Sequence, residues 1–182
     1  MRQARLLLLG AALLALTACS SPSPQTLSEL LPGPVPSGVE FAAPPADAAD
    51  APDPELTFLD GEKASLSDFW SERPVVLVFL EPWCQECADQ QSELNTVVSE
   101  YGDRVLFLGV AGEGSRDEVR DYVDAHDIRY PVALDGRGVV WRAYGVQEAP
   151  LVALISKDGK LLRGWPGGVP ELGAQLEDLV LR

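Results

Sequence analysis

The stretch VVLVFLEPWCQEC, residues 75–87, decides the fold together with the helical pattern that follows it. Residues 75–80 form a continuous apolar run rich in β-branched side chains, which is typical of a strand buried on both faces. Helical spacing then continues to a stop signal at Gly102, through the apolar positions Leu94, Val97, Val98 and Tyr101. Two cysteines therefore lie where a buried strand gives way to a helix.

This position predicts that Cys84 and Cys87 form a redox-active pair. A helix N-terminus offers unpaired N–H groups and the positive end of the helix dipole. Both favour a thiolate at Cys84, and the thiolate is the attacking form of a thiol. Cys87 lies one turn further along, where it can attack a mixed disulfide on Cys84 and release the partner. We expect Cys84 to be the nucleophile and Cys87 the resolving cysteine.

Two other uses of these cysteines are open at this point. A structural zinc site usually needs four ligands, and besides the pair the chain offers only Cys19 and the single histidine, His126. A purely structural disulfide would close a very small loop, which adds little stability. It would also have no need of a helix N-terminus. We expect neither a metal nor another cofactor.

The remaining pattern alternates between strands and helices, which predicts an α/β fold with a parallel part in its sheet. A short strand at 56–59 comes first, and the turn Asp60-Gly61 follows it. A hairpin turn at Asp158-Gly159 makes the sheet mixed. Further strands are predicted at 105–110, 132–134, 151–155 and 160–163, and further helices from 115, over 139–144 and from 172 to 180.

The start of the chain is typical of a targeting segment. Arg2 and Arg5 precede an apolar run, 6–16, that is too short to span a bilayer as a stable helix. The following Leu16-Thr17-Ala18-Cys19 resembles a bacterial lipoprotein signal, which implies a signal peptide at 1–18 and lipidation of Cys19. A secretory signal cut nearby is the alternative. Both interpretations predict export to a compartment where disulfides persist.

Residues 19–54 are predicted to be the lipidated cysteine and a tether, and residues 55–182 the folded domain. Nine of the chain's 15 prolines lie between positions 20 and 54, among Ser, Ala, Gly and Asp. Such a composition buries too little surface to offset the entropy of ordering. We expect a flexible to semi-extended tether with a reach on the order of 30–40 Å or more.

The chain is acidic, with a formal net charge of −14 at pH 7. Without residues 1–18 it loses Arg2 and Arg5, which leaves 12 basic against 28 acidic residues and a net charge of −16. Such a balance argues against a basic patch for nucleic acid and against adhesion to anionic lipid through surface charge. We expect no nucleic-acid partner and a monomeric protein.

Residues 55–182 resemble the thioredoxin superfamily, specifically its membrane-anchored TlpA/ResA-like thiol–disulfide oxidoreductases. The resemblance implies a thioredoxin-like fold, with a central mixed β-sheet flanked by helices and an N-terminal strand or hairpin extension. It implies that Pro150 is a cis-proline facing the cysteines, that the backbone at Ala149 pairs with an extended substrate segment, and that Trp83 covers the dithiol and shapes the docking surface. The stretches that carry it are Gly61, LSDF (66–69), PVVLVFLEPWCQEC (74–87), VLFLGV (105–110), YPV (130–132), YGV (144–146), AP (149–150) and LISKDG (154–159).

Several positions depart from this family's pattern. Val78 stands where many thioredoxins have a buried acidic residue that helps move protons. Gln90 stands where several ResA-like proteins have a glutamate, and Gln85-Glu86 replaces pairs that include proline. Leu151 stands where threonine is common. The resemblance therefore leaves proton handling and substrate preference open.

The expected function is disulfide exchange with exported proteins. A membrane thiol donor would supply the electrons. Cytochrome c maturation and disulfide quality control are the processes in which we expect it to act. Glu81, Glu86 and Asp89 flank the cysteines in sequence. Negative charge nearby disfavours a thiolate, and a destabilised reduced form makes the pair a weaker oxidant. We therefore expect a reducing or mildly oxidising couple, attached by lipidated Cys19 to the outer face of the bacterial cytoplasmic membrane.

Two other functions are known on related folds. A peroxiredoxin-like peroxidase needs a Thr or Ser a few residues before its nucleophile, and an arginine, whereas residues 80–83 here are Leu-Glu-Pro-Trp. A copper-delivery protein of the Sco-like kind uses a CxxxC and a later histidine. This chain has two residues between its cysteines and no histidine after His126.

Overall fold

The computed structural model describes residues 25–182, so the predicted signal peptide at 1–18 and lipidation at Cys19 lie outside the described residues. The strands are β1 Glu55–Thr57, β2 Lys63–Ser65, β3 Val75–Leu80, β4 Leu106–Ala111, β5 Val132–Leu134, β6 Leu151–Ile155 and β7 Leu161–Pro166. The helices are α1 Leu27–Leu30, α2 Ser67–Trp70, α3 Gln85–Tyr101, α4 Arg116–Ala125, α5 Val139–Ala143 and α6 Leu172–Leu179. Within this part of the chain, no helix is both long and apolar enough to cross a bilayer.

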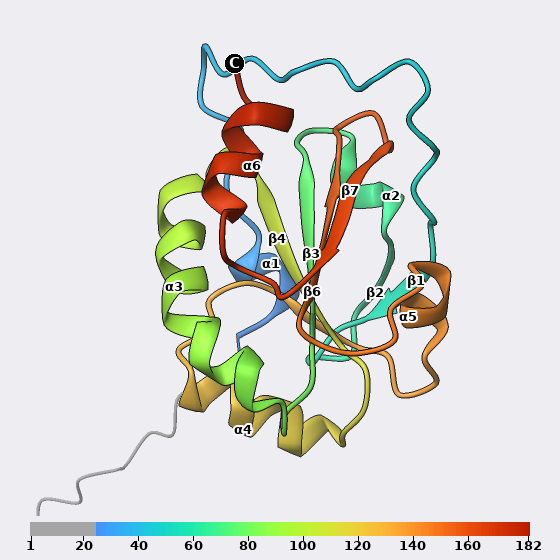
Figure 1. The fold of residues 1–182 in the computed structure, drawn as a ribbon. Helices are drawn as coiled ribbons and strands as arrows, with labels where there is room; N and C mark the ends of the chain where they lie inside the picture. The colour runs from blue at the N-terminus through green and yellow to red at the C-terminus, as the bar shows by residue number, and fades with distance from the viewer. Residues whose placement is uncertain (1–24) are drawn as a thin grey trace, which may run out of the picture.

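A five-stranded mixed sheet in the order β5-β4-β3-β6-β7 forms the centre of the molecule (Figure 1). β3 pairs in parallel with β4, and β4 with β5, whereas β6 and β7 run antiparallel to their neighbours. The strands β1 and β2 form a separate antiparallel hairpin. The predicted α/β class, the mixed sheet and the N-terminal hairpin extension are confirmed.

The two faces of the sheet carry two hydrophobic cores, and β3 contributes to both. Its residues Val76, Val78 and Leu80 face the core covered by α3, α4 and α6. Its residues Val75, Leu77 and Phe79 face the opposite core, which includes side chains of α1, α2, α5 and the hairpin. All six β3 residues are buried, as the continuous apolar run predicts.

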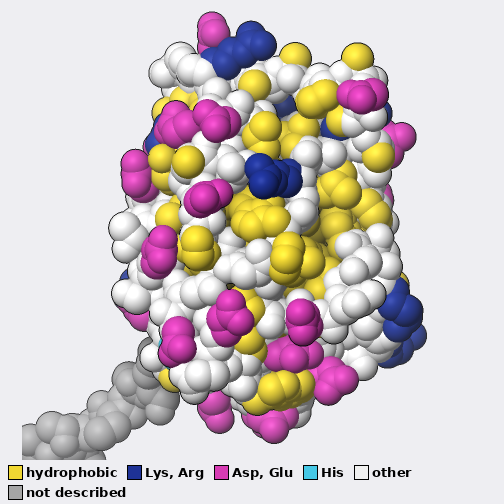
Figure 2. All heavy atoms as spheres, viewed as in Figure 1, with side chains coloured by type: hydrophobic (Ala, Val, Ile, Leu, Met, Phe, Trp, Pro, Cys, Tyr) yellow, Lys and Arg dark blue, Asp and Glu magenta, His cyan; other side chains and the backbone are white. Residues whose placement is uncertain are grey.

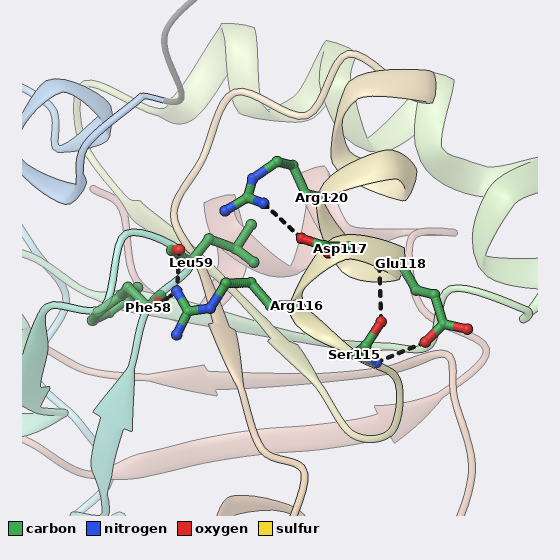
Figure 3. A network of polar contacts seen from close by, with 7 residues as sticks. All are labelled: Phe58, Leu59, Ser115, Arg116, Asp117, Glu118 and Arg120. Carbon is green, nitrogen blue, oxygen red and sulfur yellow. Dashed lines mark hydrogen bonds and ion pairs between the residues drawn. The ribbon is translucent and has the colours of Figure 1, made fainter.

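Helix α4 begins with the predicted capping box and is tied to the hairpin. The Ser115 hydroxyl accepts from the Glu118 N–H, and the Glu118 carboxylate accepts from the Ser115 N–H, as Figure 3 shows. In the same view the Arg116 guanidinium donates to the carbonyls of Phe58 and Leu59. The hairpin is therefore fixed against the start of α4, next to edge strand β5.

Residues 25–54 lie against the domain, which differs from the flexible tether predicted for this part of the chain. Leu27 and Ala51 are buried in the core that includes the hairpin. The segment crosses the end of the molecule near the C-terminus. It then runs along the side of the molecule away from α3 until it reaches β1 (Figure 1). Isolated β-bridges join it to the end of the chain and to the β6–β7 turn, namely Phe41 with Leu181 and Asp50 with Lys160.

The physical reason for this difference is that backbone groups and one buried arginine hold the segment. The Ala42 N–H donates to the Val180 carbonyl, and the Ala51 N–H donates to the Gly159 carbonyl, each at 2.9 Å. The buried Arg73 guanidinium donates to the carbonyl of Gly33. A composition argument counts side-chain surface and misses such bonds, because they need no particular residue type in the segment.

Replacing Arg73 by methionine keeps an unbranched stem as far as the ε position and removes the hydrogen bonds of the guanidinium to the carbonyls of Gly33 and Asp103. We expect Arg73→Met to lower the free energy of unfolding by about 1–3 kcal/mol, since buried acceptors lose a charged donor. Limited proteolysis should cut within residues 25–54 faster than in the wild type. Urea denaturation and digestion time courses measure the two effects.

Arg129→Met is the matched control because the Arg129 side chain is 72% exposed. Its free energy of unfolding should stay within about 0.5 kcal/mol of the wild type. An unchanged digestion rate in Arg73→Met would contradict the anchoring role of Arg73.

Candidate active site at the start of helix α3

The two cysteines lie at the junction that the sequence predicts. β3 ends at Leu80, and Cys84 is the N-cap residue of α3. Its Sγ accepts from the backbone N–H of Cys87 at 3.0 Å, so the sulfur takes the place of a capping oxygen. A disulfide joins Cys84 to Cys87. The structure thus holds the pair in its oxidised form at the positive end of a helix.

The two sulfur-bearing residues differ in exposure. Cys87 is 5% exposed and packs in the core between the sheet and α3, whereas Cys84 is only partly buried at the rim of that core. A thiol or disulfide of another protein therefore meets Cys84 first. The roles of Cys84 as nucleophile and Cys87 as resolving cysteine stay predictions.

Sheet register brings Pro150 to the same place. β6 runs antiparallel to β3 with Leu151 opposite Phe79, so the residue before β6 lies beside the end of β3. The Ala149–Pro150 peptide bond is cis, as the resemblance implies. Neither the backbone N–H nor the carbonyl of Ala149 bonds to any residue in 25–182. Ala149 therefore keeps its backbone hydrogen-bonding groups available beside the dithiol.

Trp83 is 56% exposed. Within the described part of the chain, Val139 is the other large apolar side chain that is exposed. Trp83 immediately precedes Cys84 on the surface. An exposed indole next to a reactive sulfur gives a partner protein apolar area to cover. Its part in docking stays a prediction.

Acidic groups surround the start of α3. Partial burial raises the pKa of the Glu81 carboxyl above its usual value, the Glu113 carboxylate raises it further, and a hydrogen bond from Trp83 lowers it. Figure 2 shows Asp and Glu side chains gathered at the end of the molecule where α3 begins and α4 lies. The field at the dithiol thus combines a positive helix end with several negative side chains.

A buried polar pair, which the sequence does not reveal, lies one helical turn beyond Cys87. Gln91 is 3% exposed, and its Oε1 accepts from the Tyr130 hydroxyl at 3.3 Å. Burial raises the pKa of Tyr130 and raises that of Tyr122 to about 12. These phenols therefore stay neutral near neutral pH. Val78, at the position where many thioredoxins carry an acid, is buried, so that position has no titrating group.

Other candidate residues lie outside this site. His126 ends α4 and stacks on Tyr122 with the ring centres 4.4 Å apart. Within residues 25–182, no group of three or more His, Cys, Asp or Glu side chains is placed to hold a metal ion. A cleft of about 790 Å³ lies between α1, α4 and β5, and none of its lining residues belongs to the dithiol or the cis-proline.

Comparisons with known proteins agree with this geometry. The AhpC/TSA family model matches residues 48–163. Thiol-disulfide oxidoreductase ResA of Bacillus thuringiensis subsp. konkukian (strain 97-27) is 31% identical over 115 residues, which cover 63% of this chain and 66% of that protein. The chain thus spans just under two thirds of the length of this relative.

Two further likenesses concern a sequence relative and a solved structure. Thioredoxin-like protein YneN of Bacillus subtilis (strain 168) is 29% identical over 116 residues, which cover 62% of this chain and 67% of that protein. The thioredoxin domain of a thiol-disulfide oxidoreductase from Bacteroides vulgatus matches with a TM-score of 0.65 and 20% identity, over 73% of this chain and 96% of that structure. This structural likeness shows that the fold is thioredoxin-like.

Glu81→Gln tests the charge at the end of β3. Because the pKa of Glu81 is raised in the folded state, its contribution to stability is complete below the usual value of 4.5 and is lost as pH rises through the raised pKa. We expect the variant to be more stable than the wild type at about pH 7 and equally stable at about pH 4. Urea denaturation at both pH values measures this difference.

Glu86→Gln provides the control, since Glu86 is exposed on α3. The same stability difference between Glu81→Gln and wild type at both pH values would show that the Glu81 charge does not cause it.

Proposed function

The chain belongs to the AhpC/TSA family, and from this premise we propose that it is an extracytoplasmic thiol–disulfide oxidoreductase that exchanges disulfides with exported proteins. The observation that carries the proposal is the Cys84–Cys87 disulfide at the N-terminus of α3, with Cys84 accessible and cis-Pro150 beside it. Catalysis at this site needs no cofactor, because the two sulfurs carry the electrons themselves.

Reduction of a substrate proceeds in two exchange steps. In the reduced enzyme the Cys84 thiolate attacks one sulfur of the substrate disulfide, forms a mixed disulfide and expels the other substrate sulfur as a thiolate, which takes a proton from water. The Cys87 thiol then loses its proton and attacks Cys84 Sγ. This second step closes the Cys84–Cys87 disulfide and releases the second substrate thiol. A membrane thiol donor restores the dithiol.

We place the couple on the reducing side. The helix end stabilises a thiolate at Cys84, whereas the Glu81 and Glu113 carboxylates near the end of β3 oppose it. A less stable reduced form lowers the reduction potential of the pair. A low reduction potential suits the reduction of accessible disulfides in exported proteins. Cytochrome c maturation and disulfide quality control include such substrates.

The proposed location rests on the resemblance of Leu16-Thr17-Ala18-Cys19 to a bacterial lipoprotein signal. A signal peptide at 1–18 and a lipid on Cys19 would hold the protein at the outer face of the bacterial cytoplasmic membrane, and we propose that it is a monomer there. The acidic composition supports a solvated domain that binds neither nucleic acid nor anionic lipid through its charge.

Peroxide reduction and copper delivery have less support. Residues 80–83 hold no Thr or Ser to polarise a peroxide at Cys84. The single histidine, His126, lies at the far end of α4 and stacks on Tyr122, where it is no partner for the cysteines.

Cys87→Ser is expected to accumulate mixed disulfides between Cys84 and its substrates, because the resolving thiol is gone. Non-reducing electrophoresis of the exported fraction, followed by mass spectrometry, identifies the trapped proteins. Cys84→Ser is the control and should trap none. If neither variant traps a protein and the wild type exchanges no disulfide with glutathione, the proposed function is wrong.

Cys19→Ala is expected to abolish lipid attachment and to release the protein from the membrane fraction. Metabolic labelling with a radioactive fatty acid and membrane fractionation of the producing bacterium measure both effects. A labelled, membrane-bound Cys19→Ala protein would contradict the proposed anchor.

A further inference from the structure

Gln90 connects the helix that begins at the cysteines to the loop that follows β7. It lies on α3 three residues after Cys87, and its Oε1 accepts from the backbone N–H of Val169 at 2.9 Å. Its Nε2 donates to Glu86 Oε1 at 3.3 Å. Both ends of the Gln90 amide are therefore engaged. Val169 is 4% exposed and packs in the same core as Cys87.

The loop that Gln90 holds, residues 167–169, also contacts the cis-proline. The Gly167 N–H donates to the carbonyl of Pro150 at 3.0 Å, next to the point where β6 begins. The indole of Trp165 donates to the carbonyl of Gly168 at 3.0 Å, which fixes the loop from β7. One short loop is thus bonded to α3, to β7 and to Pro150.

Gly168 shows how closely these parts approach. Its φ is +71°, and a Cβ at this position would lie 2.5 Å from Gln90 Oε1 and 3.2 Å from the Pro150 Cβ. Only a glycine fits without displacing one of these neighbours. Gln90, Gly168 and Pro150 therefore form a continuous contact across the loop, from the cysteine-bearing helix to the cis-proline.

We propose that Gln90 is a positioning residue: through Val169 and Gly168 it holds the cis-proline turn at a fixed place relative to Cys84. The proposal rests on the proposed function, in which a disulfide in an extended polypeptide segment pairs with the free backbone groups of Ala149 while Cys84 attacks, as the family resemblance implies. A small disulfide without peptide groups makes no such backbone pairing and is indifferent to the position of the turn.

The choice of an amide at position 90 follows from its two bonds. A glutamate there would accept from Val169 equally well but would face the Glu86 carboxylate one turn away, where like charges repel. Exchanging the two side chains restores both bonds, because the amide now at position 86 would donate to the carboxylate now at position 90. The double variant Glu86→Gln/Gln90→Glu therefore keeps the net charge, the acceptor for Val169 and the interaction between the two positions.

The test compares a protein disulfide with a small disulfide that has no peptide groups, using insulin and bis(2-hydroxyethyl) disulfide as substrates of the purified protein. Gln90→Leu should raise the KM for insulin about 3- to 10-fold, the range that one lost hydrogen bond produces. Its kcat with insulin and its rate with bis(2-hydroxyethyl) disulfide should stay within about twofold of the wild type, and its reduction potential should be unchanged. The double variant should restore the KM for insulin to near the wild-type value.

Thr96→Val is the control, because Thr96 is exposed on α3 well beyond the cysteines and its hydroxyl bonds only to the Ser92 carbonyl. It should leave both substrates unaffected. If Gln90→Leu slows the reactions of insulin and bis(2-hydroxyethyl) disulfide equally, shifts the reduction potential, or is not rescued by the double variant, the positioning role is wrong. If Gln90→Leu fails to fold, the double variant alone decides, since a KM for insulin far above wild type overturns the proposal.

Failure of the proposed function gives a different result. A wild-type protein that exchanges disulfides with neither substrate refutes thiol–disulfide exchange itself, whatever the variants do.

Discussion

The burial of β3 on both faces is the constraint on which the site depends. The chain leaves this strand at Leu80, and a short turn leads to Cys84 at the start of α3. Strand β6, the antiparallel neighbour of β3, must enter at the same end, which brings Pro150 beside Cys84. The dithiol and the cis-proline come from parts of the sequence more than sixty residues apart, and sheet register alone aligns them. Parallel pairing with β4 on the other side keeps β3 away from the sheet edge.

Two opposing electrostatic effects act on the Cys84 sulfur at the end of β3. The N-terminus of α3 favours negative charge at Cys84, while the carboxylates around it, with Glu81 partly buried, disfavour it. Three buried residues in this part of the molecule are neutral or apolar, namely Val78, Gln91 and Tyr130. None of them has a carboxyl group that could take up a proton from the Cys87 thiol. This arrangement differs from a thioredoxin with an acid under its resolving cysteine.

The sequence predicts those parts of the structure that periodic burial controls. The run 75–80, the spacing from Leu94 to Tyr101 and the capping box at Ser115 each identify their element, because one local pattern suffices. Contacts between distant segments have no such pattern. The bond from Gln90 to Val169, the pair of Gln91 and Tyr130, and the carboxylate of buried Asp135 that accepts from the Val139 and Trp141 N–H groups arise only once the chain is folded. The sequence does not predict the anchoring of residues 25–54 for the same reason, since this anchoring uses backbone groups and Arg73.

This anchoring would limit how far the domain reaches from a membrane to which Cys19 attached it. With Cys19 as the proposed lipid site, only residues 19–24 separate the bilayer surface from the first residues that lie on the domain. A fully extended chain of that length spans at most about 20 Å, which is shorter than the domain itself. The domain would then stay close to the lipid headgroups. It would reach only partners that are themselves membrane-bound or whose disulfides lie near the membrane surface.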